Sequence, residues 1–379
     1  MQRIESIQSK VRSVQGGRVA QMNLYPIKLT FHVNSYLFAE RLIAERLGKP
    51  GLPKGKVAET WEISGYKDKS GTVINGRLAG QTLSELTEDY ADELVGEAWE
   101  GPHFPILEKF IDASGMLPVH LHADDETARR KHGEPNGKTE AWHILWAKPD
   151  ATATAGVNVD AKHDELRDAF QLHDYDSVMT RFPVKAGDTI YVPAGVLHSF
   201  GPGTLIFEVQ QTSDLSQDVM PTDMQGNNRT FDEWMKNIDD TLDELRTGYQ
   251  PHPHAGLTLR RESASRYKVG CAGPHFALER WKLTEPHCEP RHPQRCLTVS
   301  NIGEPVQIKY EDGSETLHRA ESCIIPASLR SVRILPTHQS EAADLIACYV
   351  PDLMRDIVNP LRAAGHSDTE IRSLGEVGI

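Results

Sequence analysis

The chain has 379 residues, of which 39% are hydrophobic and 25% charged, and its formal net charge is −13. This length suits two domains, and the composition excludes a disordered, fibrous or coiled-coil protein. An acidic chain without basic clusters is a poor partner for nucleic acid, and no segment has the ~20 apolar residues of a membrane span. The five cysteines form no C-x-x-C pair, which fits reduced thiols. We therefore expect a cytoplasmic protein that binds neither nucleic acid nor membrane.

Short strands dominate the first part of the chain. Apolar or alternating runs bounded by Gly, Pro and Asp are typical of strands. Such runs lie at 26–33, 117–122, 136–147, 187–200 and 204–211. Thr82 and Glu85 have the spacing of a capping box, and they predict a surface helix that ends at Gly96. We expect this part to form a small antiparallel barrel or sandwich.

A helix and a linker follow. Thr230 and Glu233 repeat the capping-box spacing before an apolar stripe, which predicts a helix over 231–247, and the sequence GYQPHPHAG that comes after it suits a linker. A second series of strands follows, and two short helices separated by Gly365 close the chain. We therefore expect four parts: an N-terminal domain (1–230), a connecting helix and linker (231–250), a C-terminal domain (251–350) and C-terminal helices (351–379).

Histidines in two of the predicted strands suggest a metal site. His120 and His122 point to the same side of a strand, although one His-x-His pair is a weak signal in a chain with 17 histidines. The run from Gly187 is more specific, since it fits the pattern G-x5-P-x-G-x2-H that ends at His198. Its turn residues can direct His198 back across the strands. Glu140 begins a further alternating strand, so its carboxylate can reach the same interior.

The predicted metal ligands are therefore His120, His122, Glu140 and His198. Imidazole nitrogens suit Zn, Fe, Mn or Ni, and an open coordination position would let a substrate oxygen bind. The alternative is that these are interior histidines that form hydrogen bonds and bind no metal.

Several segments, in order along the chain, resemble the motifs of the type I phosphomannose isomerases, a family of the cupin superfamily. They are GLPKGKVAETWEIS, NGRLAGQTLSEL, HFPILEKFIDA, GKTEAWHIL and VPAGVLHSFGPGTLIFEVQQTSD. The resemblance implies a mainly β fold of two cupin (jelly-roll) barrels with a few surface helices, of which only the N-terminal barrel holds a metal ion. It also implies the interconversion of mannose 6-phosphate and fructose 6-phosphate on zinc.

Position by position, the resemblance makes His122, Glu140 and His198 zinc ligands. It makes Lys138 and Glu208 the residues that move the proton or contact the substrate.

The chain departs from the family pattern at sites that matter for the metal and for phosphate. His120 replaces a glutamine, Pro118 replaces a phosphate-contacting serine, and Asp218 replaces an active-site arginine. The N-terminal Trp-Gly-Gly of the family has no counterpart. Because an arginine suits bidentate contacts to anions, we expect weak activity on phosphosugars unless Arg181 or Arg229 fills the same space.

These observations predict a metal-dependent aldose–ketose isomerase that acts on a small sugar or sugar phosphate. One divalent ion is expected, with zinc favoured and iron, manganese or nickel as alternatives. Two other functions fit the same residues: an iron or manganese oxygenase of the cupin superfamily, and a sugar-binding protein without activity. A second metal site in HCEPRHPQRC, built from His287, Cys288, His292 and Cys296, is a weaker hypothesis.

Overall fold

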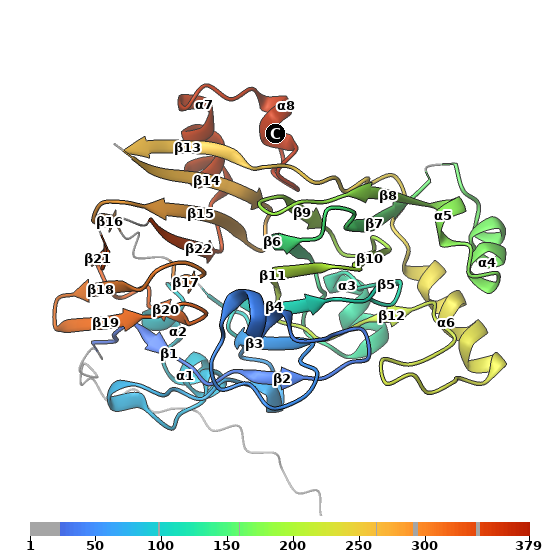
Figure 1. The fold of residues 1–379 in the computed structure, drawn as a ribbon, viewed down its shortest axis with the longest axis horizontal. Coiled ribbons are helices and arrows are strands. Elements are labelled where there is room, and N and C mark those ends of the chain that lie inside the picture. Colours follow the sequence, from blue (N-terminus) through green and yellow to red (C-terminus); the bar gives the residue numbers. More distant parts are fainter. Residues whose placement is uncertain (1–22, 98, 159, 263, 291–294, 339–341) are drawn as a thin grey trace, which may run out of the picture.

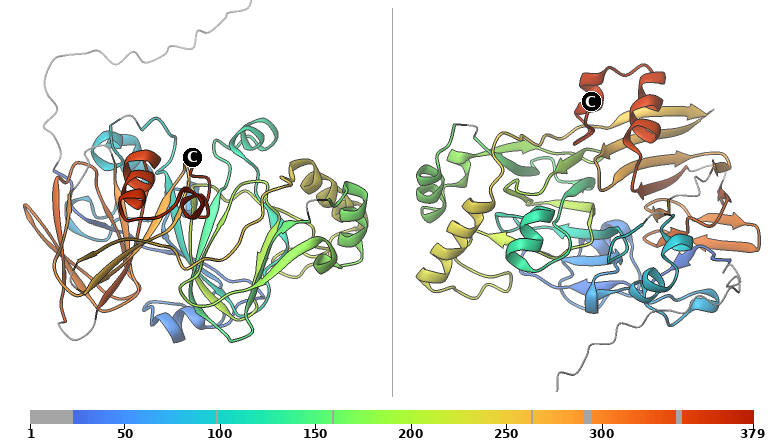
Figure 2. Two further views of the ribbon diagram at one scale, coloured as in Figure 1. Left: turned by 90° about the horizontal axis from the view of Figure 1, so that it is seen from above. Right: turned by 180° about the vertical axis from the view of Figure 1, so that it is seen from behind.

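Antiparallel sheets make up most of the structure, a computed structural model that describes residues 23–379 apart from 98, 159, 263, 291–294 and 339–341. The sheets form two facing pairs, which lie side by side in the molecule (Figure 1; Figure 2). We call them the N-terminal pair and the C-terminal pair. The expected mainly β fold is therefore confirmed.

The N-terminal pair consists of a β4 sheet and a β10 sheet. Within the described residues, the β4 sheet has the order β2 (His32–Asn34), β3 (Glu59–Ile63), β4 (Ile106–Ala113), β11 (Thr204–Gln211), β6 (Glu140–Ala147) and β9 (Thr189–Val192). The β10 sheet has the order β12 (Gln217–Asp218), β5 (His120–Leu121), β10 (His198–Phe200), β7 (Thr152–Val157) and β8 (Met179–Pro183). Apolar side chains from both sheets, such as Trp142 and Phe200, form a core between them.

The C-terminal pair has a β22 sheet and a β21 sheet. Within the described residues, the β22 sheet has the order β1 (Ile27–Lys28), β20 (Ser322–Ile325), β17 (Leu297–Asn301), β22 (Ala343–Tyr349), β15 (Ala277–Leu283), β14 (Ser265–Ala272) and β13 (Leu257–Glu262). The β21 sheet has the order β16 (His287–Pro290), β21 (Ser331–Pro336), β18 (Val306–Tyr310) and β19 (Gly313–Leu317). The first strand of the chain thus pairs in the C-terminal pair, where Ile27 lies opposite Ile324.

The helices follow the predicted caps but are shorter than expected. Thr82 caps α1 (Leu83–Asp89) with a complete capping box, and the chain bends at Tyr90 before α2 (Ala91–Leu94). Thr230 caps α6 (Phe231–Glu244) in the same way. Two helices that the sequence did not suggest, α4 (His163–Gln171) and α5 (Tyr175–Val178), pack with α6 beside the β10 sheet (Figure 1).

The chain ends in short helices that cover the C-terminal pair. They are η5 (Leu353–Val358), α7 (Asn359–Ala363) and α8 (Asp368–Arg372). Ser367 and Glu370 form the expected capping box of α8. Apolar residues of these helices, among them Ile357 and Leu361, complete the core between the β22 and β21 sheets.

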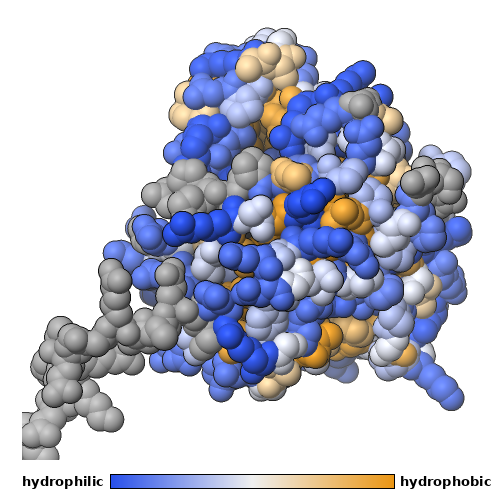
Figure 3. Space-filling model, turned by 90° about the vertical axis from the view of Figure 1, so that its left-hand side faces the viewer, coloured by the Kyte–Doolittle hydropathy of each residue, from blue (hydrophilic) through white to orange (hydrophobic). Residues whose placement is uncertain are grey.

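The two sheet pairs share one apolar core, in which Phe110 and Phe207 of the β4 sheet pack with Leu278 and Ile346 of the β22 sheet. One buried carboxyl crosses this contact, since Glu108 on β4 accepts hydrogen bonds from the hydroxyls of Thr298 and Ser300 on β17. Away from this contact, the outer side formed by the C-terminal pair is mostly hydrophilic, with small apolar patches (Figure 3). The site described next therefore lies on the β4 sheet, whose other face packs against the β22 sheet.

Candidate functional site

Three histidines meet between the sheets of the N-terminal pair. His198, at the start of β10, lies directly opposite His120 of β5 in the sheet register, and His122 follows β5. The turn before β10 needs Gly195, whose φ of +79° is unfavourable for other residues. Its N–H donates to the carbonyl of His122 at 2.7 Å. The predicted turn therefore joins the two strands that carry the histidines.

Each imidazole is oriented by a backbone carbonyl. The Nδ1 atoms of His120, His122 and His198 lie 2.8, 2.7 and 2.8 Å from the carbonyl oxygens of Pro118, Leu215 and Val196. A carbonyl can only accept, so Nδ1 of each neutral ring carries the proton and donates it. The three Nε2 atoms are thereby left as unprotonated lone-pair donors, which is the tautomer that a metal ligand needs.

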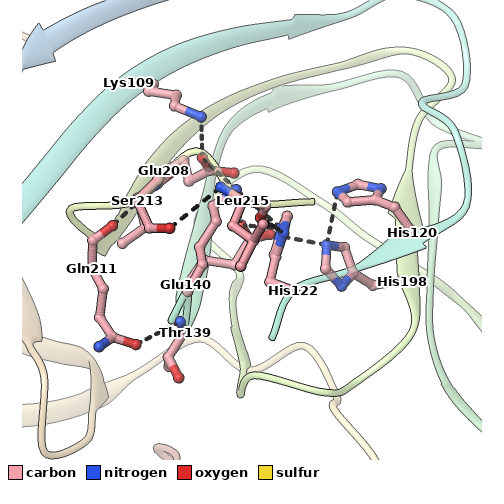
Figure 4. Close-up of polar contacts among 12 residues, drawn as sticks. Lys109, His120, His122, Thr139, Glu140, His198, Glu208, Gln211, Ser213 and Leu215 are labelled. Carbon is pink, nitrogen blue, oxygen red and sulfur yellow. Dashed lines mark hydrogen bonds and ion pairs between the residues drawn. The ribbon is translucent and has the colours of Figure 1, made fainter. Parts of the chain in front are cut away.

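The three Nε2 atoms lie close to one another, and two of them approach the same carboxylate. The possible ligand atoms of the three histidines lie within 4.8 Å of one another, and Nε2 of His198 is 3.1 Å from Nε2 of His120. The carboxylate of Glu140 approaches Nε2 of His122 to 3.1 Å and Nε2 of His198 to 3.2 Å (Figure 4). The indole of Trp142 donates to the same carboxylate at 2.7 Å and so fixes its direction. The structure thus brings all four predicted ligands together.

Burial and neighbouring charges shift pKa values in this cluster toward protonation states that can bind a cation. Burial, with the nearby imidazoles, holds the pKa of His120 well below its usual value, and burial with the Lys138 ammonium lowers the pKa of His122 to about 3. Burial alone would raise the pKa of Glu140, but Lys138 and the imidazoles outweigh it and hold that pKa well below its usual value. His120 and His122 are therefore neutral and Glu140 is ionised, and these are the forms that bind divalent metals.

These residues fit a divalent metal ion. Lone pairs that face one another at about 3 Å repel unless a cation lies among them, and a protein cation already reaches some of them. The ammonium of Lys138 lies 2.7 Å from Glu140 and 3.0 Å from Nε2 of His122. The donor set of three nitrogens and one carboxylate is one that Zn, Fe, Mn or Ni accepts.

A second charged group stands next to the histidines. Glu208 on β11 lies 3.1 Å from the ammonium of Lys109 and 3.9 Å from that of Lys138. Burial and the nearby Glu140 raise the pKa of Glu208 above its usual value, and a raised pKa suits a carboxyl that exchanges a proton with a substrate. Lys109 also lies 3.9 Å from Glu59, and these carboxylates raise its pKa against the effect of burial, so it stays charged.

A cavity of about 280 Å³ opens over this group. Its wall includes metal-ligand, charged and apolar side chains: Tyr36, Glu59, Lys109, Ile111, Leu117, Pro118, His120, His122, Lys138, Phe200, Glu208, Asp214, Ser216, Asp218 and Met224. The predicted catalytic residues Lys138 and Glu208 therefore face the same space as two of the histidines. Both departures from the family pattern near phosphate, Pro118 and Asp218, also line it.

Of the two arginines considered as replacements, Arg229 is the one that reaches Asp218. Its guanidinium binds the Asp218 carboxylate through two contacts, of 2.5 and 2.8 Å. Arg181 instead pairs with Asp176 at 2.7 Å. The Arg229 guanidinium therefore balances the charge of the Asp218 carboxylate. The replacement of the family arginine by Asp218 changes the local charge less than a full reversal from positive to negative would.

Some residues of the cavity were not assigned a role from the sequence. Lys109 and Glu59 lie in two of the quoted segments, HFPILEKFIDA and GLPKGKVAETWEIS. The resemblance of these segments to the family motifs could therefore have indicated a role for both residues. Asp214 belongs to the quoted Ser-Asp pair. Lys109 and Lys69 lower its pKa although burial opposes them. Tyr36, whose pKa burial raises strongly, lies in no quoted motif.

The weaker metal hypothesis finds no support in the described residues. His287 is buried and contacts Tyr267 and Glu289, whereas Cys288 is exposed. His292 lies outside the described residues. In the C-terminal pair, Ile325-Pro326-Ala327 matches Val192-Pro193-Ala194, which sets Ser331 at the place of His198. Among the described His, Cys, Asp and Glu side chains, the cluster at His120, His122 and His198 is the group with metal-binding geometry.

Within the described residues, no helix is both long and apolar enough to cross a membrane. No family model matches the chain.

Individual proteins do match. The chain is 31% identical to a probable mannose-6-phosphate isomerase of Bacillus subtilis over 236 residues, which are 62% of this chain and 72% of that protein. It is 30% identical to a mannose-6-phosphate isomerase of Streptococcus mutans over 300 residues, 76% of this chain and 91% of that protein. Among solved structures, the mannose 6-phosphate isomerase from B. subtilis matches with a TM-score of 0.75 and 26% identity, over 85% of this chain and 99% of that one.

Proposed function

We propose, because the chain belongs to the mannose-6-phosphate isomerase family, that it is a metal-dependent enzyme that interconverts an aldose and its ketose. The observation that carries this proposal is the convergence of three Nε2 atoms, the Glu140 carboxylate, Lys138 and Glu208 around one cavity. Such an isomerisation moves a proton between two adjacent carbons and shifts a second proton between their oxygens.

His120, His122, Glu140 and His198 are the residues that would hold the metal ion. When bound, a divalent ion supplies Lewis-acid polarisation of substrate oxygens. We propose zinc as the first ion to test, with iron, manganese and nickel as alternatives, because His120 offers an imidazole where the family has an amide.

The chain's own groups would move the protons. Glu208 suits the carbon-bound proton, since burial and Glu140 raise the pKa of its carboxyl. Lys138, whose ammonium lies 3.9 Å from Glu208, suits the transfer between the substrate oxygens. Lys109 keeps Glu208 oriented through its 3.1 Å contact. Walls such as Phe200 and Leu117 exclude water from the reacting carbons.

A direct comparison separates this proposal from the oxygenase alternative. Protein purified without added metal is analysed for its metal and then incubated with mannose, mannose 6-phosphate and their ketoses, while oxygen is recorded. The proposal predicts aldose–ketose conversion without oxygen consumption. Oxygen consumption linked to substrate loss would favour an oxygenase, and sugar binding without conversion would favour a binding protein.

A further inference from the structure

The cavity that receives the substrate is rich in carboxylates. Glu59, Glu208, Asp214 and Asp218 line it, and Glu140 lies just beneath. Among the described residues that line it, the cationic side chains are Lys109 and Lys138, and there is no arginine. A phosphate group carries about −1.5 to −2 charges at pH 7, so its binding needs cations that can turn toward it.

Both lysines, Lys109 and Lys138, already form ion pairs with carboxylates of the site. Lys109 lies 3.1 Å from Glu208 and 3.9 Å from Glu59, and it is almost completely buried. Lys138 lies 2.7 Å from Glu140 and, like Lys109, has little freedom to move. A phosphate would have to compete with these carboxylates for the same ammonium groups, and Asp214 and Asp218, whose charges Lys69 and Arg229 balance, offer it no further cation.

Arg229 contacts Asp218 but is not among the residues that line the cavity. Arg229 binds both carboxylate oxygens of Asp218, and the same guanidinium donates to the carbonyls of Met220 at 2.7 Å and Thr222 at 2.9 Å. The bidentate pair and the two carbonyls hold it behind Asp218. The cavity wall therefore presents the carboxylate and not the guanidinium.

We infer that this site takes an unphosphorylated monosaccharide, and that the Asp218–Arg229 pair sets this specificity. The inference rests on the proposed isomerase function. Glu59, Asp214 and Asp218 already accept from protein donors, but each carboxylate oxygen has a second lone pair to which a sugar hydroxyl can donate. Apolar side chains such as Ile111 and Phe200 suit the C–H face of a sugar ring. The volume of about 280 Å³ lies just below the ~300 Å³ of the smallest pockets for drug-sized ligands, which suits one sugar ring.

Binding tests the inference separately from catalysis. The dissociation constants of mannose and mannose 6-phosphate are measured by calorimetry on the metal-loaded full-length protein. We expect mannose to bind at least tenfold more tightly. Mannose 6-phosphate binding equally or more tightly would overturn the inference, whether or not the protein isomerises either sugar. Isomerisation is assayed in parallel, and its absence would count against the proposed function alone.

A variant identifies the determinant. Asp218→Asn removes the carboxylate charge, keeps the side-chain shape and leaves the charge of the Arg229 guanidinium unbalanced beside the cavity. We expect mannose 6-phosphate to bind about tenfold to a hundredfold more tightly, with mannose changed less than threefold. Asp176→Asn, which breaks the exposed Arg181–Asp176 pair, is the matched control and should change neither constant. If Asp218→Asn leaves phosphosugar binding unchanged, the pair does not set the specificity. If that variant fails to fold, the ratio for the unmodified protein still decides the substrate class.

Discussion

Nε2 of His198 lies 3.1 Å from Nε2 of His120, and neither atom carries a proton in the neutral rings. The reason is that both Nδ1 atoms donate to backbone carbonyls, of Val196 and Pro118. Two lone pairs at this distance do not form a hydrogen bond. Such an arrangement suits a cation shared by the two rings, so the carbonyls that orient the rings would support the proposed metal site.

Loss of one imidazole should remove the metal. His198→Ala deletes one of the four converging donors, and we expect the metal content of purified protein to fall from about one ion per chain to a small fraction. His252→Ala, at an exposed histidine of the linker, should leave it unchanged. Elemental analysis of both variants measures this. Equal metal content in the two would show that the ion binds elsewhere.

The turn before β10 should control the same site. Gly195→Ala places a Cβ 2.8 Å from the Cβ of Arg246 and 3.0 Å from the carbonyl oxygen of Glu244, at a φ of +79°. We expect a loss of about 1–3 kcal/mol in stability and weaker metal binding, because the turn and His198 move together. Gly187→Ala is the control, since its φ is +93° and its Cβ would meet nothing within 4 Å. Chemical denaturation and metal titration compare them. Equal losses of stability and metal binding in the two variants would mean that the positive φ causes them and that the contacts of the new Cβ do not.

The proton-transfer role of Glu208 predicts a catalytic defect without loss of metal. Glu208→Gln keeps the shape but cannot take up a proton, so we expect kcat to fall about 10²- to 10⁴-fold on the substrate found by the assays above. Glu285→Gln, on the exposed surface of the C-terminal pair, serves as the control. Steady-state kinetics and metal analysis are made on the same samples. Unchanged kcat in Glu208→Gln would assign the proton transfer to another group.

Glu108 should make the stability depend on pH. Burial raises its pKa to about 7 although Thr298 and Ser300 donate to it. The folded state therefore binds a proton that the unfolded state releases at a lower pH. This contribution is complete below about pH 4 and is lost as pH rises to about 7, a change on the order of 3 kcal/mol. Glu108→Gln keeps an uncharged partner for both hydroxyls, so its unfolding free energy should vary less between pH 5 and 8. Parallel pH dependence in both proteins would contradict this.

The clustering of the three histidines could be predicted because local spacing determines it. His120 and His122 are two residues apart at the end of β5, with ring centroids 4.9 Å apart, and the turn at Gly195 directs His198 toward them. The Asp218–Arg229 pair could not be predicted in this way, since it depends on how the chain folds back between residues 218 and 229. The bend at Tyr90 could not be predicted either. The helical spacing of apolar residues continues through Tyr90, whereas the helical backbone is interrupted there.

The central claim is that metal bound at His120, His122, Glu140 and His198 enables proton transfer on a sugar. Proton NMR in D₂O tests it most directly, with metal-stripped and metal-reconstituted protein and with mannose and mannose 6-phosphate as substrates. We predict that deuterium enters at the carbons next to the carbonyl, or that ketose forms, only with reconstituted protein. Equal conversion by the stripped protein, or no conversion of either sugar by the reconstituted one, would contradict the claim.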